Sequence, residues 1–364
     1  MTIRMFSWTE ALQVLAPAWI EMVRNLGLNP SHDPRWMDAV VRSHGISDET
    51  RVAAWFQERE LVGILPFRQT VVRRMGLPLR TVAPVTNLVS YHAGLIASCQ
   101  AEQLLAETLR QAGAGGWDLL HFNNVPADSA TGRTLEAFAR QHGSTIITQP
   151  GETSPYIRIT TDWDQFLATR TKKFRANVTR ATRRMADAGE TGMEWTIGTG
   201  DTDRLLTRML AVEAASWKAE SGIAISQSTT ERDYHAQLLP ALAGMQALFA
   251  NVLLVKDRPA AYVLGCRYNG WVGQLKTSFD RQIADAGARV IDASVRRAFD
   301  EQADVYDFLG DAAPHKLKWT SDLNSHSNYW IYSRGLAARM AGGTTRLLDR
   351  IRRRGGTARQ NGGE

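Results

Sequence analysis

The sequence predicts an α/β protein of two domains, each with a mixed sheet flanked by helices. Its 364 residues, 44% of them hydrophobic, are enough to bury two medium-sized cores. Segments of strand length alternate with segments of helical periodicity in both halves, which is typical of a layered α/β architecture. Between the halves, the stretch from Gln149 to Pro155 gathers Pro, Gly and polar residues and is the predicted linker.

Composition and the chain start exclude several classes of protein. A charged fraction of 22% and aromatic residues spread along the chain are typical of a folded protein. The two cysteines, Cys99 and Cys266, suggest neither a disulfide framework nor a metal site, so a reducing compartment and no metal are expected. The first ten residues lack a signal-peptide pattern, and no apolar run is long enough to span a membrane. We therefore expect a cytoplasmic location.

The net charge of +6 is concentrated at the end of the chain. Of 43 basic and 37 acidic residues, eight and two lie from Ser333 onward, which leaves 35 of each in the remainder. The high isoelectric point is therefore a property of this tail. It is weak support for nucleic-acid binding by the folded body, and no specific nucleic acid is expected.

The first domain is expected to span residues 1–154 and to combine a mixed sheet with covering helices. Helices are predicted from near Arg35, from Ala101 to Ala112 and from Thr131 to His142, and strands from Arg51 to Phe56, from Leu61 to Phe67 and from Asp118 to Phe122.

The second domain is expected to span residues 155–332. Helices are predicted from Asp162 to about Ala188, from about Thr202 to Glu220 and from about Ala288 to Gln302. Strands are predicted from Tyr156 to Ile159, from Ala247 to Val255, from Ala260 to Tyr268, from Trp271 to Ser278 and from Val305 to Leu309. Asn269-Gly270 between two of them is the signature of a tight type I′ hairpin.

The strand predicted from Trp271 to Ser278 leads into a possible phosphate site. It ends in Lys276-Thr277-Ser278-Phe279-Asp280, and a short loop then reaches Ala286-Gly287-Ala288 at a helix start. Free amides and the helix dipole favour an anion at such a position, and glycine permits a close approach. Alone the signal is weak, because Gly287 could equally be an ordinary turn residue.

Four segments of the second half resemble the CelD/BioF2-like acyltransferase domain of the GNAT superfamily. They are Thr171 to Arg175, Glu213 to Lys218 with Gly222, Leu275 to Asp280, and Tyr306 to Asp311 with Lys316 and Trp319. The first half resembles the family's N-terminal half less distinctly, through Leu61 to Pro66 and Trp117-Asp118.

The resemblance implies two tandem GNAT-like domains, as in the Fem ligases, each with a mostly antiparallel mixed sheet. It implies an acyl-CoA donor on the second domain and an amine acceptor. The donor contacts would be Lys276, Thr277, Ala286, Gly287, Ala288 and Arg289. The family usually has Pro-Gly where this chain has Ala286-Gly287, so the glycine is kept and the loop shape is open.

Glu213 is the candidate general base. Leu206, Leu210, Glu213 and Trp217 recur at helical spacing, so they are expected on one apolar face. Burial there would raise the pKa of the carboxyl and suit it to take a proton from an attacking amine. A structural Glu213 paired with Arg or Lys across the core is an equally good interpretation.

Two further catalytic candidates are Tyr262 and Lys316. Tyr262 could protonate the leaving thiolate, although packing also accounts for it. In the Fem ligases a Lys-Lys-Trp-like segment follows a strand-ending turn near the reacting groups. By this resemblance Lys316 would contact donor phosphate or the reacting carbonyl, unless it is an ordinary surface lysine.

Substrate contacts are expected from residues in the same motifs and in the basic helix that follows Asp162. They are Trp217, Lys218, Lys172, Arg175, Asp307 and Trp319. For Lys172 and Arg175, an anion site competes with a solvated basic face as the interpretation.

Residues 333–364 form the basic tail. Leucines, Met340 and Ile351 alternate there with arginines, which indicates either an interfacial helix on anionic lipid or a partly disordered extension. Gly342-Gly343 weakens the single-helix interpretation. The location would then be cytoplasmic, at the inner face of a membrane.

The residues and the resemblance together predict an acyl-CoA-dependent N-acyltransferase acting on an amine of a sugar, amino acid or lipid precursor, in envelope or polysaccharide biosynthesis. Two alternatives stay open: a Fem-type transferase that uses aminoacyl-tRNA, and a non-catalytic GNAT-fold adaptor in polysaccharide assembly.

Overall fold

The computed structural model describes residues 2–86, 94–112, 116–187 and 191–360. It divides into two compact units. Unit 1 comprises Met1–Leu28, Ile46–Glu152 and Ser325–Glu364, and unit 2 comprises Asn29–Gly45 and Thr153–Asn324. The units differ from the predicted domains in two ways, because residues 29–45 belong with the second unit and residues from 325 onward return to the first.

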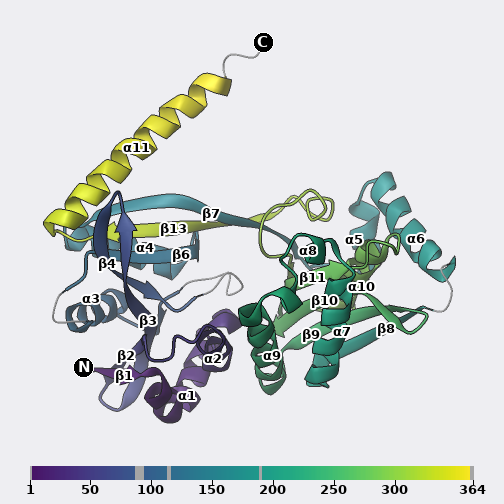
Figure 1. Cartoon of the computed structure of the whole chain (residues 1–364), viewed down its shortest axis with the longest axis horizontal. Helices are drawn as coiled ribbons and strands as arrows, with labels where there is room; N and C mark the ends of the chain where they lie inside the picture. Colours follow the sequence, from purple (N-terminus) through teal and green to yellow (C-terminus); the bar gives the residue numbers. More distant parts are fainter. Residues whose placement is uncertain (1, 87–93, 113–115, 188–190, 361–364) are drawn as a thin grey trace. The chain divides into compact units, whose positions relative to one another are not determined.

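Unit 1 is a twisted sheet with helices packed on it (Figure 1). Its helices are α1 (Trp8–Asn25), α3 (Ala101–Gln111), α4 (Ala130–Gln141) and α11 (Leu336–Gln360). Its strands are β1 (Thr2–Ser7), β2 (Thr50–Gln57), β3 (Glu60–Arg74), β4 (Leu77–Pro84), β5 (Ile96–Ala97), β6 (Leu119–Pro126), the first part of β7 (Thr145–Arg158) and most of β13 (Leu323–Tyr332).

The sheet of unit 1 runs in the order β1-β2-β3-β4-β6-β13-β7, with β5 beside β3. β1 to β4 are antiparallel neighbours, whereas β4 and β6 are parallel and pair only at Thr81–Leu119 and Val82–Leu120. A buried apolar cluster joins the sheet to α3 and α4, with Leu105 and Phe138 among its members.

Unit 2 has the same kind of architecture with more helices (Figure 1). Its helices are α2 (Pro34–Ser43), α5 (Trp163–Thr169), α6 (Lys172–Asp187), α7 (Thr202–Ala214), α8 (Trp217–Glu220), α9 (Thr229–Gly244) and α10 (Ala286–Asp300). Its strands are the last part of β7 with β8 (Thr191–Gly198), β9 (Leu248–Val255), β10 (Arg258–Tyr268), β11 (Trp271–Phe279) and β12 (Val305–Asp307).

The sheet of unit 2 runs in the order β8-β9-β10-β11-β12-β7. β8 to β11 are antiparallel, and β11 and β12 are parallel. Helix α10 lies over the face of β10 that carries Ala261 and Val263, in one apolar cluster with Trp163 and Phe299. The alternate residue Tyr262 points to the face where α7 packs, because successive strand side chains point to opposite faces.

The two sheets repeat one topology. In each unit a strand and at least one helix precede three antiparallel strands, and a helix then leads to a strand parallel to the last of the three. In each unit an antiparallel strand completes the edge beyond that parallel pair, β13 beside β6 and β7 beside β12. The prediction of two domains with mostly antiparallel mixed sheets is therefore confirmed.

Local signals explain several of these elements. Asn269 and Gly270 both have positive φ, of 47° and 76°, so the β10–β11 hairpin has the tight turn expected from Asn-Gly. Asp201 begins α7 by accepting a hydrogen bond from the amide of Arg204. Ser216 ends the preceding segment and caps α8, since its hydroxyl accepts from the amide of Lys218 at 3.2 Å.

Three predictions about unit boundaries and helices are wrong. The stretch from Gln149 to Pro155 is the middle of β7 and not a linker, because its backbone lies within the strand that runs through both sheets. The helix expected from Asp162 is broken between Thr169 and Lys172, and its expected end at Ala188 lies outside the described residues. The helix expected to reach Glu220 ends at Ala214, where the Ser216 cap starts a new turn.

The start of the basic tail is an integral part of unit 1. α11 runs through Gly342-Gly343 without a break. Its Ala338 and Ala341 are fully buried in a cluster with Leu79 and Tyr332. A Cβ at Gly342 would lie only 3.0 Å from the Tyr332 ring, so glycine permits this close packing. Residues 336–345 are therefore a packed helix and not a disordered extension.

Among the described helices, none is both long enough and apolar enough to cross a bilayer.

Candidate functional site

The parallel strands β11 and β12 pair over a short stretch only. Their last pair is Gly273–Asp307, after which β12 ends and β11 continues to Phe279. Leu275 is an extra residue in β11, since Leu264 pairs with Lys276 and Gly265 with Gln274. Such a bulge twists a strand locally. The last six residues of β11 therefore have β10 on one side and no strand of the described chain on the other.

The part of β11 beyond its last pair with β12, Gln274–Phe279, leads directly to the start of α10. A Cβ at Gly287 would lie 2.5 Å from the Phe279 ring, so the helix start packs on the strand end and requires glycine there. Within the described chain, the amides of Gly287 and Ala288 have no hydrogen-bond acceptor. Ala286 is different, because its amide donates to Ile283. Two free amides at a helix N-terminus fit the predicted anion site.

Charged side chains surround this helix start. Asp285, which precedes α10, forms an ion pair with Arg184 of α6 at 3.0 Å. The Asp285 carboxylate would repel a bound phosphate, and the positive charge of Arg184 reduces this repulsion. The packing of α6 on α10 brings Arg184 to this position. Arg289 forms an ion pair with Asp292, one turn further along α10. It also lines a hollow of about 250 Å³ beside Trp195.

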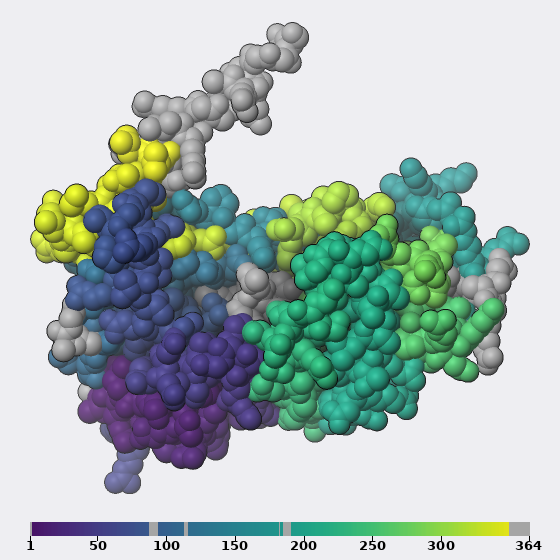
Figure 2. Space-filling view, viewed as in Figure 1, coloured from purple at the N-terminus to yellow at the C-terminus, as the bar shows by residue number. Residues whose placement is uncertain are grey.

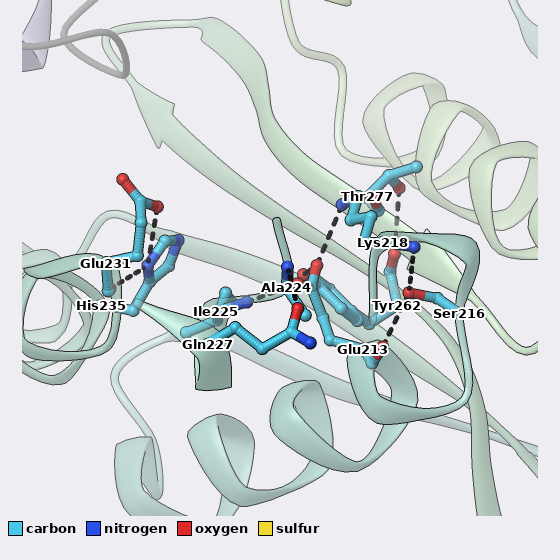
Figure 3. A network of polar contacts seen from close by, with 10 residues as sticks. All are labelled: Glu213, Ser216, Lys218, Ala224, Ile225, Gln227, Glu231, His235, Tyr262 and Thr277. Atoms are coloured by element: carbon cyan, nitrogen blue, oxygen red, sulfur yellow. Dashed lines mark hydrogen bonds and ion pairs between the residues drawn. The ribbon is translucent and has the colours of Figure 1, made fainter. Parts of the chain in front are cut away.

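Glu213 is the centre of a buried polar network on the opposite face of the sheet (Figure 3). Its side chain is fully buried at the end of α7. One carboxylate oxygen accepts hydrogen bonds from Lys218 Nζ at 2.9 Å and from the Tyr262 hydroxyl at 2.7 Å. The other accepts from the amide of Ile225 at 2.9 Å. Lys218 Nζ also donates to the backbone carbonyl of Thr277 in β11 at 2.7 Å.

The network holds Glu213 as a carboxylate. Burial alone raises the pKa of this carboxyl, but Lys218, Lys276, Tyr262 and the amide of Ile225 together outweigh burial and lower the pKa below 4.5. The expected rise of the Glu213 pKa is therefore wrong, and the paired interpretation is the one that the geometry favours. Burial lowers the pKa of Lys218 and raises that of Tyr262 well above its ordinary value.

Lys276 adds a second positive charge to this face. It pairs with Leu264 in the sheet register, so it projects to the same side as Tyr262. Its charge lowers the pKa of Glu213 and of Lys218. His235 of α9 is 1% exposed. Its pKa is lowered chiefly by burial, and the charge of Lys276 lowers it further. The face thus holds two lysines, the buried carboxylate of Glu213 and, beside His235, the partly exposed carboxylate of Glu231.

The face of α7 differs in detail from the predicted one. Its buried stripe consists of Leu205, Met209, Val212 and Glu213, whereas Leu206 and Leu210 are half-buried. Trp217 is 42% exposed in α8. The break after Ala214 accounts for this change, because it removes Trp217 from the stripe of α7.

Several predicted site residues have structural contacts elsewhere in unit 2. Lys316 donates to the carbonyl of Leu309, and Asp307 accepts from the Leu309 amide, so both hold the turn after β12. Trp319 is buried in the apolar cluster below α10. Arg175 donates to the carbonyls of Ala168 and Arg170, and Lys172 is exposed at the start of α6. None of these contacts involves Glu213 or its hydrogen-bond partners.

The described residues contain no group of three or more His, Cys, Asp or Glu side chains that could hold a metal ion. Cys99 and Cys266 are both free thiols.

The sequence of unit 2 matches a known family. Residues 172–317 match the family model described as "Acetyltransferase (GNAT) domain". This range includes β8 to β12, the Glu213 network and the start of α10. Unit 2 carries a GNAT domain. Because unit 1 repeats its topology, the chain has a tandem GNAT-like fold, and its domain type places it among the transferases.

Solved structures show the same fold over nearly the whole chain. The C-terminal domain of a putative lysylphosphatidylglycerol synthetase from Agrobacterium fabrum has a TM-score of 0.56 at 10% identity, covering 92% of this chain and 95% of that one. FemX has a TM-score of 0.55 at 11% identity, with coverages of 93% and 99%. L-PGS from Bacillus licheniformis has a TM-score of 0.52 at 12% identity, with coverages of 86% and 96%. No curated protein matches the sequence significantly.

These likenesses establish the fold and not the substrates. The predicted resemblance to GNAT and Fem-type proteins is confirmed at that level. The candidate site has three parts: the stretch of β11 beyond Gly273, the free amides at the start of α10, and the network around Glu213.

Proposed function

We propose that the protein is an acyl-CoA-dependent N-acyltransferase. The observation that carries the proposal is the continuation of β11 past the end of β12 into two free amides at the start of α10. Backbone groups along Gln274–Phe279 would bind the extended thiol arm of the donor as an added strand would be bound. The amides of Gly287 and Ala288, with Arg184 nearby, would bind the diphosphate.

The chemistry is transfer of an acyl group from sulfur to nitrogen. The acceptor nitrogen attacks the thioester carbonyl carbon, the carbonyl oxygen gains negative charge, and the C–S bond then breaks as the thiolate leaves. The nitrogen loses one proton and the thiolate gains one, so the proton count balances. Groups that hold the oxyanion and move this proton would accelerate the reaction.

In this proposal Glu213 acts through Lys218. A carboxylate with a lowered pKa and three donors is a weak base, but it fixes the ammonium of Lys218 against the carbonyl of Thr277. The ammonium then lies beside the stretch of β11 proposed for the thioester, where a positive charge would stabilise the oxyanion. Tyr262 positions Glu213, since its buried hydroxyl donates to the carboxylate. The turn held by Lys316 would close the site beyond β12.

An acceptor with a negative group beside its amine suits this face. Glu213 forms an ion pair with Lys218, and the carboxylate of Glu231 lies beside His235, so Lys276 has no ion-pair partner among the described residues. The lowered pKa of His235 leaves that ring neutral near pH 7. An amino acid or a phosphorylated amino sugar would compensate for the extra charge. This narrows the acceptor to amines that carry a carboxylate or phosphate.

Replacing Lys276 by Gln is expected to raise KM for such an acceptor about tenfold, with a smaller change in kcat, because one charge-assisted contact is lost. Steady-state kinetics with an amino acid and with its carboxamide would measure this. The carboxamide should show little change. Lys318→Gln, at an exposed lysine of the same unit, is the control. Equal losses for acid and amide would contradict the assignment of Lys276.

Free CoA and acetyl-CoA are expected to raise the melting temperature of the protein, because a ligand that binds only the folded state stabilises it by mass action. At a hundred times its Kd the gain is about 2.7 kcal/mol. Thermal shift with acetyl-CoA, longer acyl-CoAs and dephospho-CoA would measure the effect and rank the acyl chain lengths. No shift with any of them would remove the donor from the proposal.

The Fem-type alternative has one observation in its favour. α6 exposes Lys172, Lys173, Arg180 and Arg183, and such a face would attract an RNA-linked donor. The same assay with aminoacyl-tRNA in place of acyl-CoA distinguishes the two. Binding of neither donor would support the non-catalytic adaptor.

A further inference from the structure

The outer face of α11 carries an apolar stripe that no described residue covers. Leu336, Met340 and Leu347 are 75%, 56% and 58% exposed. At about 100° per residue, their side chains leave the helix within a sector of roughly 40°. Leu336 is the most exposed large apolar side chain among the described residues.

The packing of the other face fixes the direction of this stripe. Ala338 and Ala341 are fully buried, Thr345 is 4% exposed, and Gly342 lies against the Tyr332 ring. These residues lie on the side of the helix opposite to the stripe. The stripe is therefore presented outward by a helix that is anchored in the core of unit 1.

Arginines accompany the stripe. Arg339 and Arg346 are exposed on one flank of it. From Ser333 onward the chain has eight arginines against two acidic residues, while the remainder is balanced. The net positive charge of the protein thus lies in the same segment as this apolar stripe.

A neighbouring hairpin of the same unit has the same character. Val71, Val72 and Met75 are 67%, 37% and 47% exposed near the tip of β3 and β4. The exposed Arg73 lies among them, and the half-buried Arg74 lies over the Trp330 ring. α11 packs on β4, and Figure 2 shows the yellow start of this helix against the blue strands. Helix and hairpin therefore belong to one surface region of unit 1.

We infer that this region, the α11 stripe with the β3–β4 hairpin tip, docks on a membrane surface that contains anionic phospholipid. Apolar side chains flanked by arginines suit the boundary between acyl chains and negative headgroups. Two weak elements acting together would bind better than either alone. A second copy of the chain is a poorer occupant, because it would bring the same positive charge to the contact.

Membrane docking of this region would be independent of acyl transfer. Deletion of residues 333–364 would be a poor test of it. Such a deletion removes Ala338 and Ala341 from the core, so the loss of binding and the loss of folding could not be separated. Substitutions at exposed side chains avoid this difficulty.

The test is co-sedimentation of the full chain with two kinds of vesicle. One is phosphatidylcholine alone, and the other contains about 30% phosphatidylglycerol, which gives its surface a negative potential. The protein should bind the anionic vesicles and leave the neutral ones, and added salt should release it. The variant Leu336→Glu/Met340→Glu/Leu347→Glu should lose about tenfold or more in vesicle partitioning. Arg339→Gln/Arg346→Gln should lose a comparable amount.

Val14→Glu is the matched control, since Val14 is 58% exposed on α1 of the same unit and has no arginine stripe beside it. It should bind as the unchanged protein does. Circular dichroism would show that each variant is folded. Absence of binding to anionic vesicles, or unchanged binding by the triple variant, would overturn the inference. So would a dimer in light scattering that the triple variant dissociates without any vesicle binding, because a second copy would then cover the stripe.

Discussion

Replacing Glu213 by Gln is expected to lower the free energy of unfolding by about 3 kcal/mol and to abolish most of the transferase activity. The carboxylate is fully buried and neutralises Lys218, whose ammonium would be left inside the protein without its counter-charge. Removing one partner of a buried pair costs about 3–5 kcal/mol, and the remaining amide–hydroxyl contacts place this change at the lower end. Urea unfolding and steady-state kinetics would measure both losses.

The double variant Glu213→Gln/Lys218→Met provides the control. With both charges gone it should regain much of the lost stability, while activity should stay low. Tyr262→Phe, which removes one donor from the carboxylate, should cost only about 1 kcal/mol. If Glu213→Gln lost activity at full stability, the carboxylate would be acting as a base, and the anchoring role proposed for it would be wrong.

The difference in unfolding free energy between the unchanged protein and Glu213→Gln should depend on pH in a definite direction. The folded-state pKa of Glu213 lies below its ordinary value of 4.5, so the folded state binds a proton less readily than the unfolded chain. Its contribution to stability is therefore complete above pH 4.5 and is lost as the pH falls through the folded pKa. The unfolding free energies of the unchanged protein and Glu213→Gln should converge in acid.

Replacing Gly287 by Val is expected to remove the donor-induced rise in melting temperature and to lower the free energy of unfolding by about 1–3 kcal/mol. Even a Cβ at this position would meet the Phe279 ring at 2.5 Å, so the helix start must move away from the end of β11. The two free amides would move with it. Thermal shift with CoA and urea unfolding would measure the two effects.

Gly244→Val is the matched control, because Gly244 ends α9 in unit 2 and has no atom within 4 Å of the added Cβ. It should keep its response to CoA. A full CoA response in Gly287→Val would show that the diphosphate binds somewhere other than the start of α10.

Sequence reasoning succeeded where local chemistry decides structure. The Asn269-Gly270 hairpin and the strands β9 to β11 were predicted almost to the residue, because turn signals bound short apolar runs. It failed at Gln149 to Pro155, where Pro and Gly indicate a linker but the residues lie within a long strand. Pairing with strands far away in the sequence overrides the local preference there.

The sequence identified most residues of the candidate site but not the hydrogen bonds that join them. Glu213, Lys218, Tyr262, Lys276 and Thr277 all appear among the candidates, yet nothing in their spacing shows that Lys218 would join the carboxylate to β11. Arg184 and His235 were not predicted, because their positions depend on how α6 packs on α10 and α9 on α7. The pKa of Glu213 was predicted with the wrong sign because burial was visible in the periodicity and the partners were not.

The membership of β13 in unit 1 has a consequence during synthesis. The first unit to leave the ribosome lacks its penultimate strand until Ser325 to Tyr332 have been translated, and it lacks the α11 packing for some ten residues more. Unit 2, whose last residue is Asn324, is complete before then. The N-terminal half of this protein is thus made first and finished last, and a chain cut after residue 154 would carry an open sheet edge.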